Sequence, residues 1–139
     1  MNEATGSSAL TFRNVSKIYE RGPGDGRFAL RDVSFSIPSG ATIAIMGRSG
    51  SGKSTLLHLA AGIDVPSRGE VLISGHNLST LSERARTLLR RHETGLIFQF
   101  FYLLPHLCVR DNVALPAFIA GGSTSEFKDR VLELLDEVG

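Results

Sequence analysis

The feature that most constrains this chain is the segment GRSGSGKST, which runs from Gly47 to Thr55. It fits the pattern of a glycine, four residues and then Gly-Lys-Ser, which is typical of a phosphate-binding P-loop. The apolar run Thr42 to Met46 before it predicts a buried strand, and LLHLAAG after it predicts a buried helix ending at Gly62. The segment therefore predicts an α/β fold in which a glycine loop joins a strand to a helix.

The chemistry of such a loop accounts for its residue types. Gly50 and Gly52 carry no Cβ, so the backbone can turn its N–H groups toward the oxygens of a polyphosphate. The N-terminus of the following helix attracts the same negative charge. Lys53 extends a cation to the β and γ phosphates, and Ser54 supplies a hydroxyl to a bridging Mg²⁺.

We therefore predict nucleoside triphosphate binding by the whole loop. Its residues are Gly47, Arg48, Ser49, Gly50, Ser51, Gly52, Lys53, Ser54 and Thr55. A flexible Gly/Ser turn that happens to contain a lysine is the structural alternative. The predicted strand before the loop and helix after it favour nucleotide binding.

Composition narrows the class of protein. The chain has 139 residues, enough for one domain, with 42% apolar and 21% charged residues, as in an ordinary soluble protein. The net charge of +1 gives no reason to expect nucleic acid as a partner. The single cysteine, Cys108, favours a reducing compartment. The longest apolar run, Phe100 to Val109, is far shorter than the ~20 residues of a membrane-spanning helix, and the N-terminus has no signal-peptide pattern.

Hydrophobic periodicity and turn residues predict the remaining elements. Residues 1–9 are expected to be flexible. Turns are expected at 21–27, which is rich in Gly and Pro, and at SGHN, residues 74–77. The predicted strands are 10–19, 33–37, 70–73 and 96–98. The predicted helices are 82–91, with a capping box formed by Thr80 and Glu83, then 109–118, and a last helix capped by Ser123 and Glu126 that ends at Gly139.

Several segments in order resemble the N-terminal half of an ATP-binding cassette (ABC) transporter ATPase. Tyr19 precedes ALRDVSFSIPSG, which leads into the P-loop, and LIFQFFYLLPHLCVRDNVALP follows. The resemblance covers about Leu10 to Gly139, and the aromatic run with LLP is most similar to the lipoprotein-release and macrolide-export type. It implies an antiparallel β subdomain, a P-loop core to about residue 99, and the start of a helical subdomain at about 100–139.

The same resemblance implies roles for individual residues. Tyr19 would stack on the adenine ring of ATP, whereas the structural alternative is a core tyrosine on a strand. Gln99 would reach Mg²⁺ and the attacking water, whereas the alternative is a polar residue that closes a strand. Lys53 and Gln99 are thus the expected catalytic residues, and Ser54 and Gln99 the expected metal ligands. Thr55 would place a hydroxyl near the α-phosphate or cap its own helix.

The resemblance also implies partners and a location. We expect a transmembrane permease subunit, a second ATPase subunit in a head-to-tail homodimer, and a cytoplasmic position at the inner face of the cell membrane. The aromatic cluster at 100–104 would contact the permease, or pack in the core. The arginines at 84, 86, 90 and 91 are expected to form a solvated helix face, because no pattern of nucleic-acid binding accompanies them.

Parts of the family pattern are missing from the chain. The LSGGQ signature, the strand ending in aspartate with its following glutamate, and the switch histidine are not found. We therefore expect a C-terminally incomplete domain that binds Mg-ATP but whose hydrolysis is doubtful. The alternatives are a non-catalytic nucleotide-binding fragment, or another P-loop NTPase or kinase. The second is disfavoured because about forty residues precede the loop and no Asn-Lys-x-Asp motif occurs.

Overall fold

The computed structural model describes residues 8–20 and 26–139, and only the backbone of residues 124–126. The predicted turn at 21–27 therefore lies mostly outside the described residues, as does most of the stretch 1–9. The chain forms two compact units, the first ending at Leu96 and the second running from Ile97 to Gly139. Each unit is described by itself.

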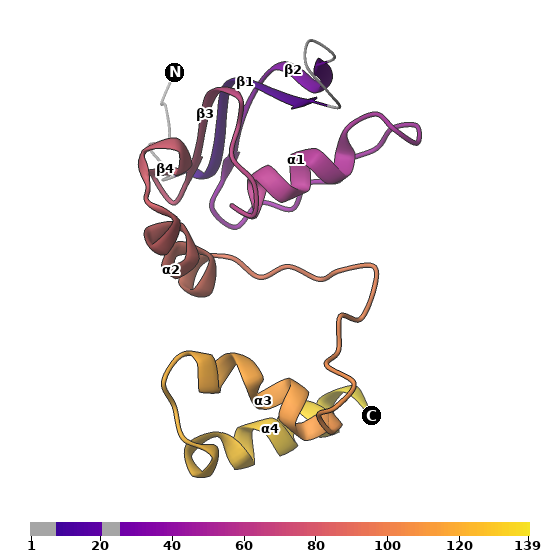
Figure 1. Cartoon of the computed structure of the whole chain (residues 1–139), viewed down its shortest axis with the longest axis vertical. Coiled ribbons are helices and arrows are strands. Elements are labelled where there is room, and N and C mark those ends of the chain that lie inside the picture. Colours follow the sequence, from indigo (N-terminus) through magenta and orange to yellow (C-terminus); the bar gives the residue numbers. More distant parts are fainter. Residues whose placement is uncertain (1–7, 21–25) are drawn as a thin grey trace. The chain divides into compact units, whose positions relative to one another are not determined.

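The first unit is built on an antiparallel sheet (Figure 1). Its strands are β1 (Ser8–Glu20), β2 (Gly26–Pro38), β3 (Arg68–Ile73) and β4 (His76–Asn77), in the order β2-β1-β3-β4. The predicted strands at 10–19, 33–37 and 70–73 are thus confirmed, and β2 begins seven residues before its predicted start. In β2 the alternation of half-buried Val33, Phe35 and Ile37 with exposed neighbours follows the period of two that the sequence shows.

Two residues with positive φ lie where the pairing of β1 with β2 becomes irregular. Asn14 and Asp32 both have positive φ, 49° and 50°, and the Asn14 side-chain amide donates to Oδ1 of Asp32 at 3.0 Å. The register between the strands shifts on both sides of Val15. Such bulges increase the local twist of a strand pair. Beyond the irregular stretch, Ile18 pairs with Phe28 and Tyr19 pairs with Arg27 at the ends of the strands.

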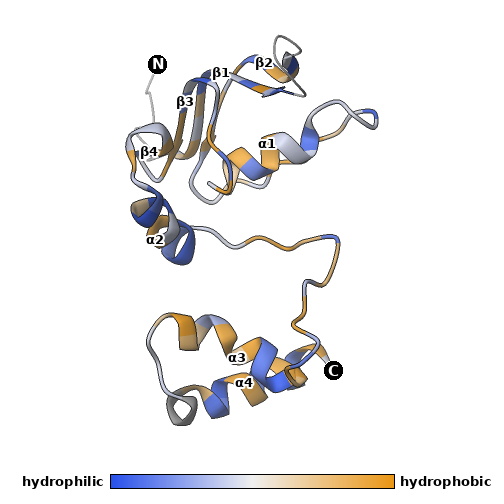
Figure 2. Cartoon of the chain, in the orientation of Figure 1, coloured by the Kyte–Doolittle hydropathy of each residue, from blue (hydrophilic) through white to orange (hydrophobic). Residues whose placement is uncertain are grey.

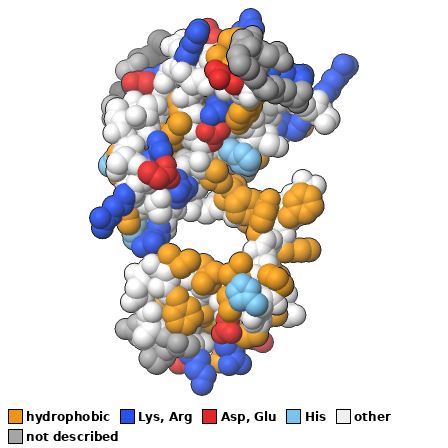
Figure 3. Space-filling view, in the orientation of Figure 1, with side chains coloured by type: hydrophobic (Ala, Val, Ile, Leu, Met, Phe, Trp, Pro, Cys, Tyr) orange, Lys and Arg blue, Asp and Glu red, His pale blue; other side chains and the backbone are white. Residues whose placement is uncertain are grey.

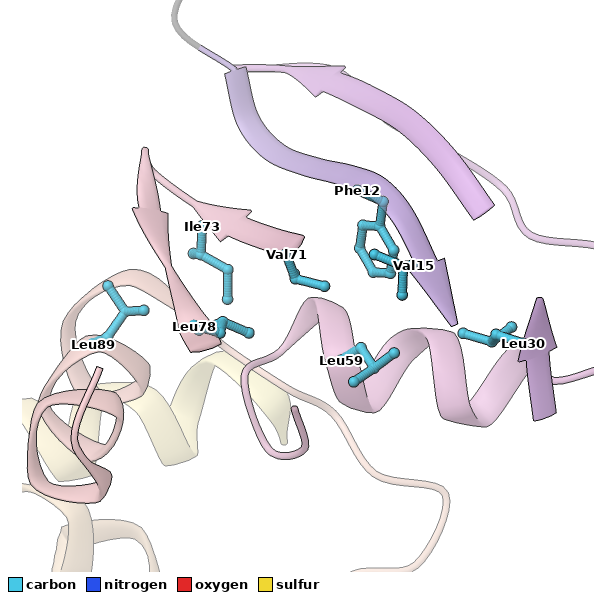
Figure 4. Close-up of a cluster of buried hydrophobic side chains, with 8 residues drawn as sticks. All are labelled: Phe12, Val15, Leu30, Leu59, Val71, Ile73, Leu78 and Leu89. Carbon is cyan, nitrogen blue, oxygen red and sulfur yellow. The ribbon is translucent and has the colours of Figure 1, made fainter. Parts of the chain in front are cut away.

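The core lies between this sheet and the helix α1 (Lys53–Ala60), and α2 (Glu83–Glu93) closes one end of it. The rings of Phe12 and Phe35 stack 4.6 Å apart across β1 and β2, and Leu59 of α1 is fully buried against the cluster. Figure 4 shows the buried side chains Phe12, Val15, Leu30, Leu59, Val71, Ile73, Leu78 and Leu89. Burying a Leu side chain of this kind contributes about 1.5 to 3 kcal/mol, so the cluster holds α1 firmly on the sheet.

The entry to α2 differs in detail from the prediction. A 3-10 turn, η1 (Leu78–Thr80), precedes it, and Ser82 is its N-cap, accepting from the Ala85 N–H at 3.3 Å. The predicted capping box of Thr80 with Glu83 is wrong, because the Thr80 hydroxyl donates to the Asn77 carbonyl instead. Figure 2 shows that α2 is largely hydrophilic.

The arginines of α2 are not all free in solvent. Arg86 and Arg90 form ion pairs with Glu83, and Arg90 also donates to the Gly62 carbonyl at 2.9 Å. The predicted solvated face therefore needs correction for these two side chains. These ion pairs form because Arg86 and Arg90 follow Glu83 by three and seven residues, which places all three side chains on the same face of the helix.

Two predicted strands are absent from the described residues. The segments 42–46 and 96–98 have no regular structure, and no described strand pairs with either. A strand in a parallel sheet needs hydrogen bonds from neighbouring strands, and apolar sequence alone does not supply them. Met46 is 89% exposed, and segment 43–46 helps line an apolar hollow of about 510 Å³ against Leu56 and Leu57. The predicted turn SGHN is half right, since Ser74 and Gly75 turn while His76 and Asn77 form β4.

The second unit contains a helix pair, α3 (Val109–Ile119) and α4 (Thr124–Val138). The two helices lie close to the predicted ranges, and they pack through buried Ala114 and Val131. Gly122 lies against the ring of Phe127, where a Cβ would clash. Among the described residues, none of the helices is both long enough and apolar enough to cross a membrane.

Candidate nucleotide-binding site

A cleft of about 680 Å³ opens where the ends of β1 and β2 meet the P-loop and the start of α1. It is lined by Tyr19, Arg27, Phe28, Ala29, Ser49, Gly50, Gly52, Lys53, Ser54 and Thr55. Most of the predicted P-loop residues therefore share one cavity with the predicted adenine-stacking residue. Gly47, Arg48 and Ser51 belong to the same loop but do not line the cleft.

The loop backbone has the conformation that its glycines allow. Gly50 and Gly52 have φ of 75° and 91°, in the left-handed region that other residues rarely adopt. The Ser51 N–H donates to the Arg48 carbonyl at 3.2 Å, which closes a tight turn. Gly52 is the N-cap of α1, and its carbonyl accepts from the Leu56 N–H at 2.9 Å. The loop therefore delivers the chain directly into the helix N-terminus.

Gly52 also fixes the helix N-terminus against the sheet. A Cβ on this residue would lie 2.5 Å from the Ala29 carbonyl oxygen and 2.9 Å from Cδ2 of Leu30, both in β2. Both distances are shorter than side-chain carbons tolerate. Only a glycine allows the loop to approach β2 this closely.

The ammonium group of Lys53 lies across the loop. Its Nζ donates to the carbonyl oxygens of Gly47 at 2.7 Å and of Arg48 at 2.8 Å. A lysine has three N–H donors, so one remains beside these two bonds for an anion in the cleft. The lysine thereby tethers the start of the loop to the helix and places a positive charge at the cleft wall.

The electrostatics of the cleft favour an anion. The first turn of α1 contains no acidic residue, so the positive end of its dipole is not neutralised by a neighbour on the helix. Lys53 and Arg27 add two cations, and the described residues that line the cleft include no carboxylate. Ser54 and Thr55, in the first turn, contribute hydroxyls at the same wall. This combination suits a polyphosphate.

Tyr19 lines the cleft near the end of β1. Its side chain is 42% exposed, which contradicts the core alternative for this residue. Its hydroxyl donates to Oδ2 of Asp64 at 3.1 Å, and the Lys17 ammonium lies 5.1 Å from the ring centroid. The ring is thus both held in place and open to the cleft, and stacking on adenine stays a prediction.

Asp64 is ionised by its surroundings. Partial burial pushes its pKa upward, but hydrogen bonds from the Lys17 ammonium and the Val65 N–H, the charge of Lys17 and the Tyr19 hydroxyl together hold the pKa below its usual value. The Lys17 Nζ is 2.6 Å from Oδ1 and also donates to the Val65 carbonyl at 2.9 Å. The carboxylate is therefore charged and fixed at neutral pH.

Sequence reasoning missed Arg27 and Phe28 as cleft residues. The guanidinium of Arg31 lies 4.2 Å from the Phe28 ring centroid, so this second aromatic ring is also held by a cation. Arg27 falls in the turn predicted at 21–27, and Phe28 belongs to no motif recognised in the sequence. The signal that could have found them is strand pairing, because Arg27 and Phe28 at the start of β2 pair with Tyr19 and Ile18 of β1.

Gln99 belongs to the second unit, where it is exposed, and its role stays a prediction. The neighbouring aromatic segment is exposed as well: Phe100 is 69%, Phe101 91% and Tyr102 71% exposed. Core packing is thus not observed for these side chains. Figure 3 shows hydrophobic side chains at the surface of this part of the chain.

One side chain fixes the end of the aromatic segment. Oδ1 of Asn112 in α3 accepts from the Leu104 N–H at 2.8 Å, and its amide nitrogen lies 3.1 Å from the carbonyl oxygens of Leu104, Leu107 and Cys108. Cys108 is the N-cap of α3 but makes no capping bond, and its thiol instead donates to the Asp111 carboxylate at 3.1 Å. Asn112 therefore anchors the segment where the N-cap does not.

The glycine loop, the helix N-terminus and the cationic cleft define a P-loop nucleotide-binding domain. A sequence model of the family described as ABC transporter matches residues 30–139. The chain therefore belongs to the ABC transporter family, as an ATP-binding domain. The predicted family and fold are confirmed.

Individual relatives agree with this assignment. The chain is 42% identical over 132 residues to the lipoprotein-releasing system ATP-binding protein LolD of Pseudomonas syringae pv. tomato, which agrees with the predicted subgroup. It is also similar to the ATP-binding cassette MJ0796, in a dimeric post-hydrolysis state bound to ADP and Pi, with a TM-score of 0.84 and 37% identity. A second dimeric structure of MJ0796, described as a bacterial ABC transporter cassette, gives the same values.

These matches cover nearly all of this chain but only part of the relatives. The alignment with LolD includes 95% of this chain and 58% of the relative. The match with MJ0796 includes 91% of this chain and 56% of the other. The chain thus spans somewhat more than half the length of the relatives that it resembles.

Proposed function

We propose that the cleft binds Mg-ATP, and that the protein acts as the ATPase subunit of an ABC transporter, which powers transport through a membrane partner. The observation that carries this proposal is the composition of the cleft. It joins a phosphate-binding loop and helix N-terminus to aromatic rings from β1 and β2 within one cavity of about 680 Å³. A nucleoside triphosphate has the matching parts, an anionic tail and a planar base.

The loop side supports binding of the phosphates. Gly50 and Gly52 are in the left-handed conformation, and the cations Lys53 and Arg27 line the same cleft. Backbone N–H groups and a helix N-terminus form a favourable site for a polyphosphate. We assign the phosphate contacts to the loop from Gly47 to Thr55, with Lys53 as the principal charge.

The strand side supports binding of the base. Tyr19 is partly exposed in the cleft, and Phe28 lines the cleft beside it. A planar base stacks well on an aromatic face and gains about 1 to 3 kcal/mol from it. We assign Tyr19 the stacking role and Phe28 an apolar contact at the same end of the cleft.

The residues present fit a Mg²⁺ ion. Ser54 lines the cleft directly after Lys53, and its hydroxyl is a hard oxygen ligand of the kind that Mg²⁺ prefers. By the family resemblance, Gln99 would be a second ligand. When bound with ATP, the ion supplies positive charge to the β and γ phosphates.

Hydrolysis needs a group that the cleft does not contain. None of the described residues that line it is Asp, Glu or His, so no general base for the attacking water is present there. We therefore expect this chain to bind ATP with negligible steady turnover, which keeps a non-catalytic nucleotide-binding role as the second candidate.

The proposed partners are a transmembrane permease subunit and a second copy of the ATPase, with the protein at the cytoplasmic face of the membrane. The similarity to MJ0796, whose structures are dimeric, supports the second copy. The exposed aromatic segment at 100–104 supports a protein partner, because aromatic side chains are enriched in the cores of interfaces. Gln99 precedes this segment directly and would relay the state of the nucleotide.

The proposal is tested by calorimetric titration of ATP with Mg²⁺ into the chain and its variants. Lys53→Ala removes a charge-assisted contact of about 1.5 to 3 kcal/mol and should weaken binding by one to two orders of magnitude. Lys128→Ala, on the exposed surface of α4, is the matched control and should bind as the unchanged chain does. Equal affinities of all three chains would contradict the proposal. Steady ATP turnover that disappears in Lys53→Ala would contradict its non-hydrolytic part.

A further inference from the structure

A polar network behind Tyr19 connects the cleft to the turn after α1. The Tyr19 hydroxyl donates to Oδ2 of Asp64, while Oδ1 of the same carboxylate accepts from the Lys17 ammonium and from the Val65 N–H at 2.8 Å. Asp64 and Tyr19 are separated by 45 residues along the chain. The two carboxylate oxygens thus have different partners. Oδ1 bonds to the Lys17 ammonium and the Val65 N–H, and Oδ2 bonds to the Tyr19 hydroxyl.

The ion pair in this network is less exposed than an ordinary surface contact. The side chains of Lys17 and Asp64 are 12% and 27% exposed, so both charges lie largely out of water. The Lys17 ammonium also lies 5.1 Å from the centroid of the Tyr19 ring, close enough for a cation–π contact. The phenol therefore has a fixed partner at its hydroxyl and a second at its ring.

The contacts of Lys17 and Asp64 with Tyr19 restrict the rotamer of a side chain that lines the cleft. Lys17 and Asp64 are not among the residues that line the cleft, whereas Tyr19 is. A tyrosine that is 42% exposed at the end of a strand would otherwise rotate about χ1 and χ2. Each rotamer that is frozen before binding removes a cost that the ligand would have to meet.

We infer that Asp64, held by Lys17, is a positioning residue that sets the orientation of the Tyr19 ring for stacking on the base of a nucleotide. The inference rests on the proposed function, since it requires that the base binds at Tyr19. It concerns the base alone. In the proposed function the phosphates bind to the loop at 47–55, and the side-chain bonds of the network do not involve that loop.

The test compares two probes, ATP and inorganic tripolyphosphate, each titrated with Mg²⁺ into the full chain by calorimetry. Asp64→Asn keeps the size of the side chain but weakens its bonds to Tyr19 and Lys17. We expect ATP affinity to fall about three- to tenfold, the range for one lost hydrogen bond, with tripolyphosphate affinity unchanged. Asp129→Asn on exposed α4 is the matched control and should change neither.

Tyr19→Phe provides a second route that leaves the Lys17 to Asp64 ion pair intact. It keeps the ring and removes only the hydroxyl, so it should reproduce the selective loss of ATP affinity. Adding Asp64→Asn to Tyr19→Phe should cause less further loss than Asp64→Asn causes alone, because the two groups act through one contact. Full additivity of the two losses would overturn the inference.

The outcomes separate this inference from the proposed function. Tyr19→Ala removes the ring, and if ATP affinity is unchanged, the base does not bind there and the proposed function fails at that end. If Tyr19→Ala weakens ATP binding while Asp64→Asn and Tyr19→Phe do not, only the positioning role is wrong. An equal loss of ATP and tripolyphosphate affinity in Asp64→Asn would show a merely structural role and would also overturn the inference.

Discussion

The guanidinium group of Arg90 donates a hydrogen bond of 2.9 Å to the carbonyl oxygen of Gly62. Gly62 follows the last turn of α1 and has a φ of 68°, the left-handed conformation that ends many helices. A cation at this position satisfies a free carbonyl and complements the negative end of the helix dipole. The bond joins α2 to the C-terminus of the helix whose N-terminus forms the cleft.

Replacing Arg90 by Gln should therefore destabilise the first unit. We expect Arg90→Gln to lower the free energy of unfolding by about 1 to 2 kcal/mol, because a charged donor is lost from a largely buried carbonyl contact. Arg91→Gln, one residue along the same helix and exposed, should change it by less than about 0.5 kcal/mol. Urea denaturation monitored by circular dichroism measures both, and equal effects would contradict the role of this bond.

The close approach of the P-loop to β2 predicts that alanine substitutions at two glycines have different effects. Gly52→Ala adds a Cβ that clashes with the Ala29 carbonyl and Leu30, whereas Gly50→Ala adds one with nothing within 4 Å. Both residues have positive φ, so each substitution costs about 1 kcal/mol in backbone strain. We expect Gly52→Ala to reduce stability and ATP affinity much more than Gly50→Ala, in urea denaturation and calorimetry. Comparable losses would mean that the close approach does not matter.

Arg27 should contribute to ATP binding through its charge. Its side chain lines the cleft and is solvent-exposed, so its attraction to phosphate is screened by salt. We expect Arg27→Gln to weaken ATP binding about two- to fivefold in 50 mM salt and by less in 500 mM salt. Arg84→Gln on exposed α2 is the control. A loss that does not change with salt would point to packing of the arginine and not to its charge.

The pKa of Asp64 predicts how stability depends on pH. Because the pKa is lower in the folded chain than in the unfolded chain, the ionised carboxylate stabilises the fold fully above the unfolded value of about 4. This contribution is lost as the pH falls from about 4 through the lower folded pKa. In urea denaturation between pH 2 and 7, Asp64→Asn should lose less stability than the unchanged chain over that acidic range. Parallel curves would contradict this assignment.

The anchor at Asn112 predicts a local change in the second unit. Asn112→Ala removes one acceptor and one amide donor group from the loop around Leu104, so the Leu104 N–H should exchange with solvent faster. Asn112→Asp keeps the acceptor but places negative charge near three carbonyl oxygens, and it should not restore protection. Hydrogen exchange of the Leu104 N–H, measured by NMR in both variants, tests these expectations. Unchanged protection of Leu104 in Asn112→Ala would contradict the anchor.

Local sequence patterns predicted the helices and strands whose formation depends mainly on residues close together in the sequence. The alternation of β2, the periodicity of α4 and the P-loop motif before α1 were each read from a short window of sequence. The strand predicted at 42–46 failed because its hydrogen bonds must come from other strands, and none of the described strands supplies them. The apolar residues of that segment predicted a buried strand, but they could not show which strands would pair with it.

The candidate site divides in the same way. The loop residues from Gly47 to Thr55 are contiguous, so one motif identified them together. The contact between Tyr19 and Asp64 joins residues that are far apart in sequence, and the role of Phe28 depends on the pairing of β1 with β2. The family resemblance already indicated Tyr19, whereas only the fold brings Phe28 into the cleft and Asp64 to the Tyr19 hydroxyl.

The close approach of Gly52 to Ala29 has a consequence for protein engineering. The P-loop of this chain fits closely against β2, because a Cβ on Gly52 would lie only 2.5 Å from the Ala29 carbonyl oxygen. A chimera that grafts residues 47–55 onto another scaffold would carry the motif without the surface that shapes it. Transplanting the nucleotide site would require β2 to be moved together with the loop, in the same register.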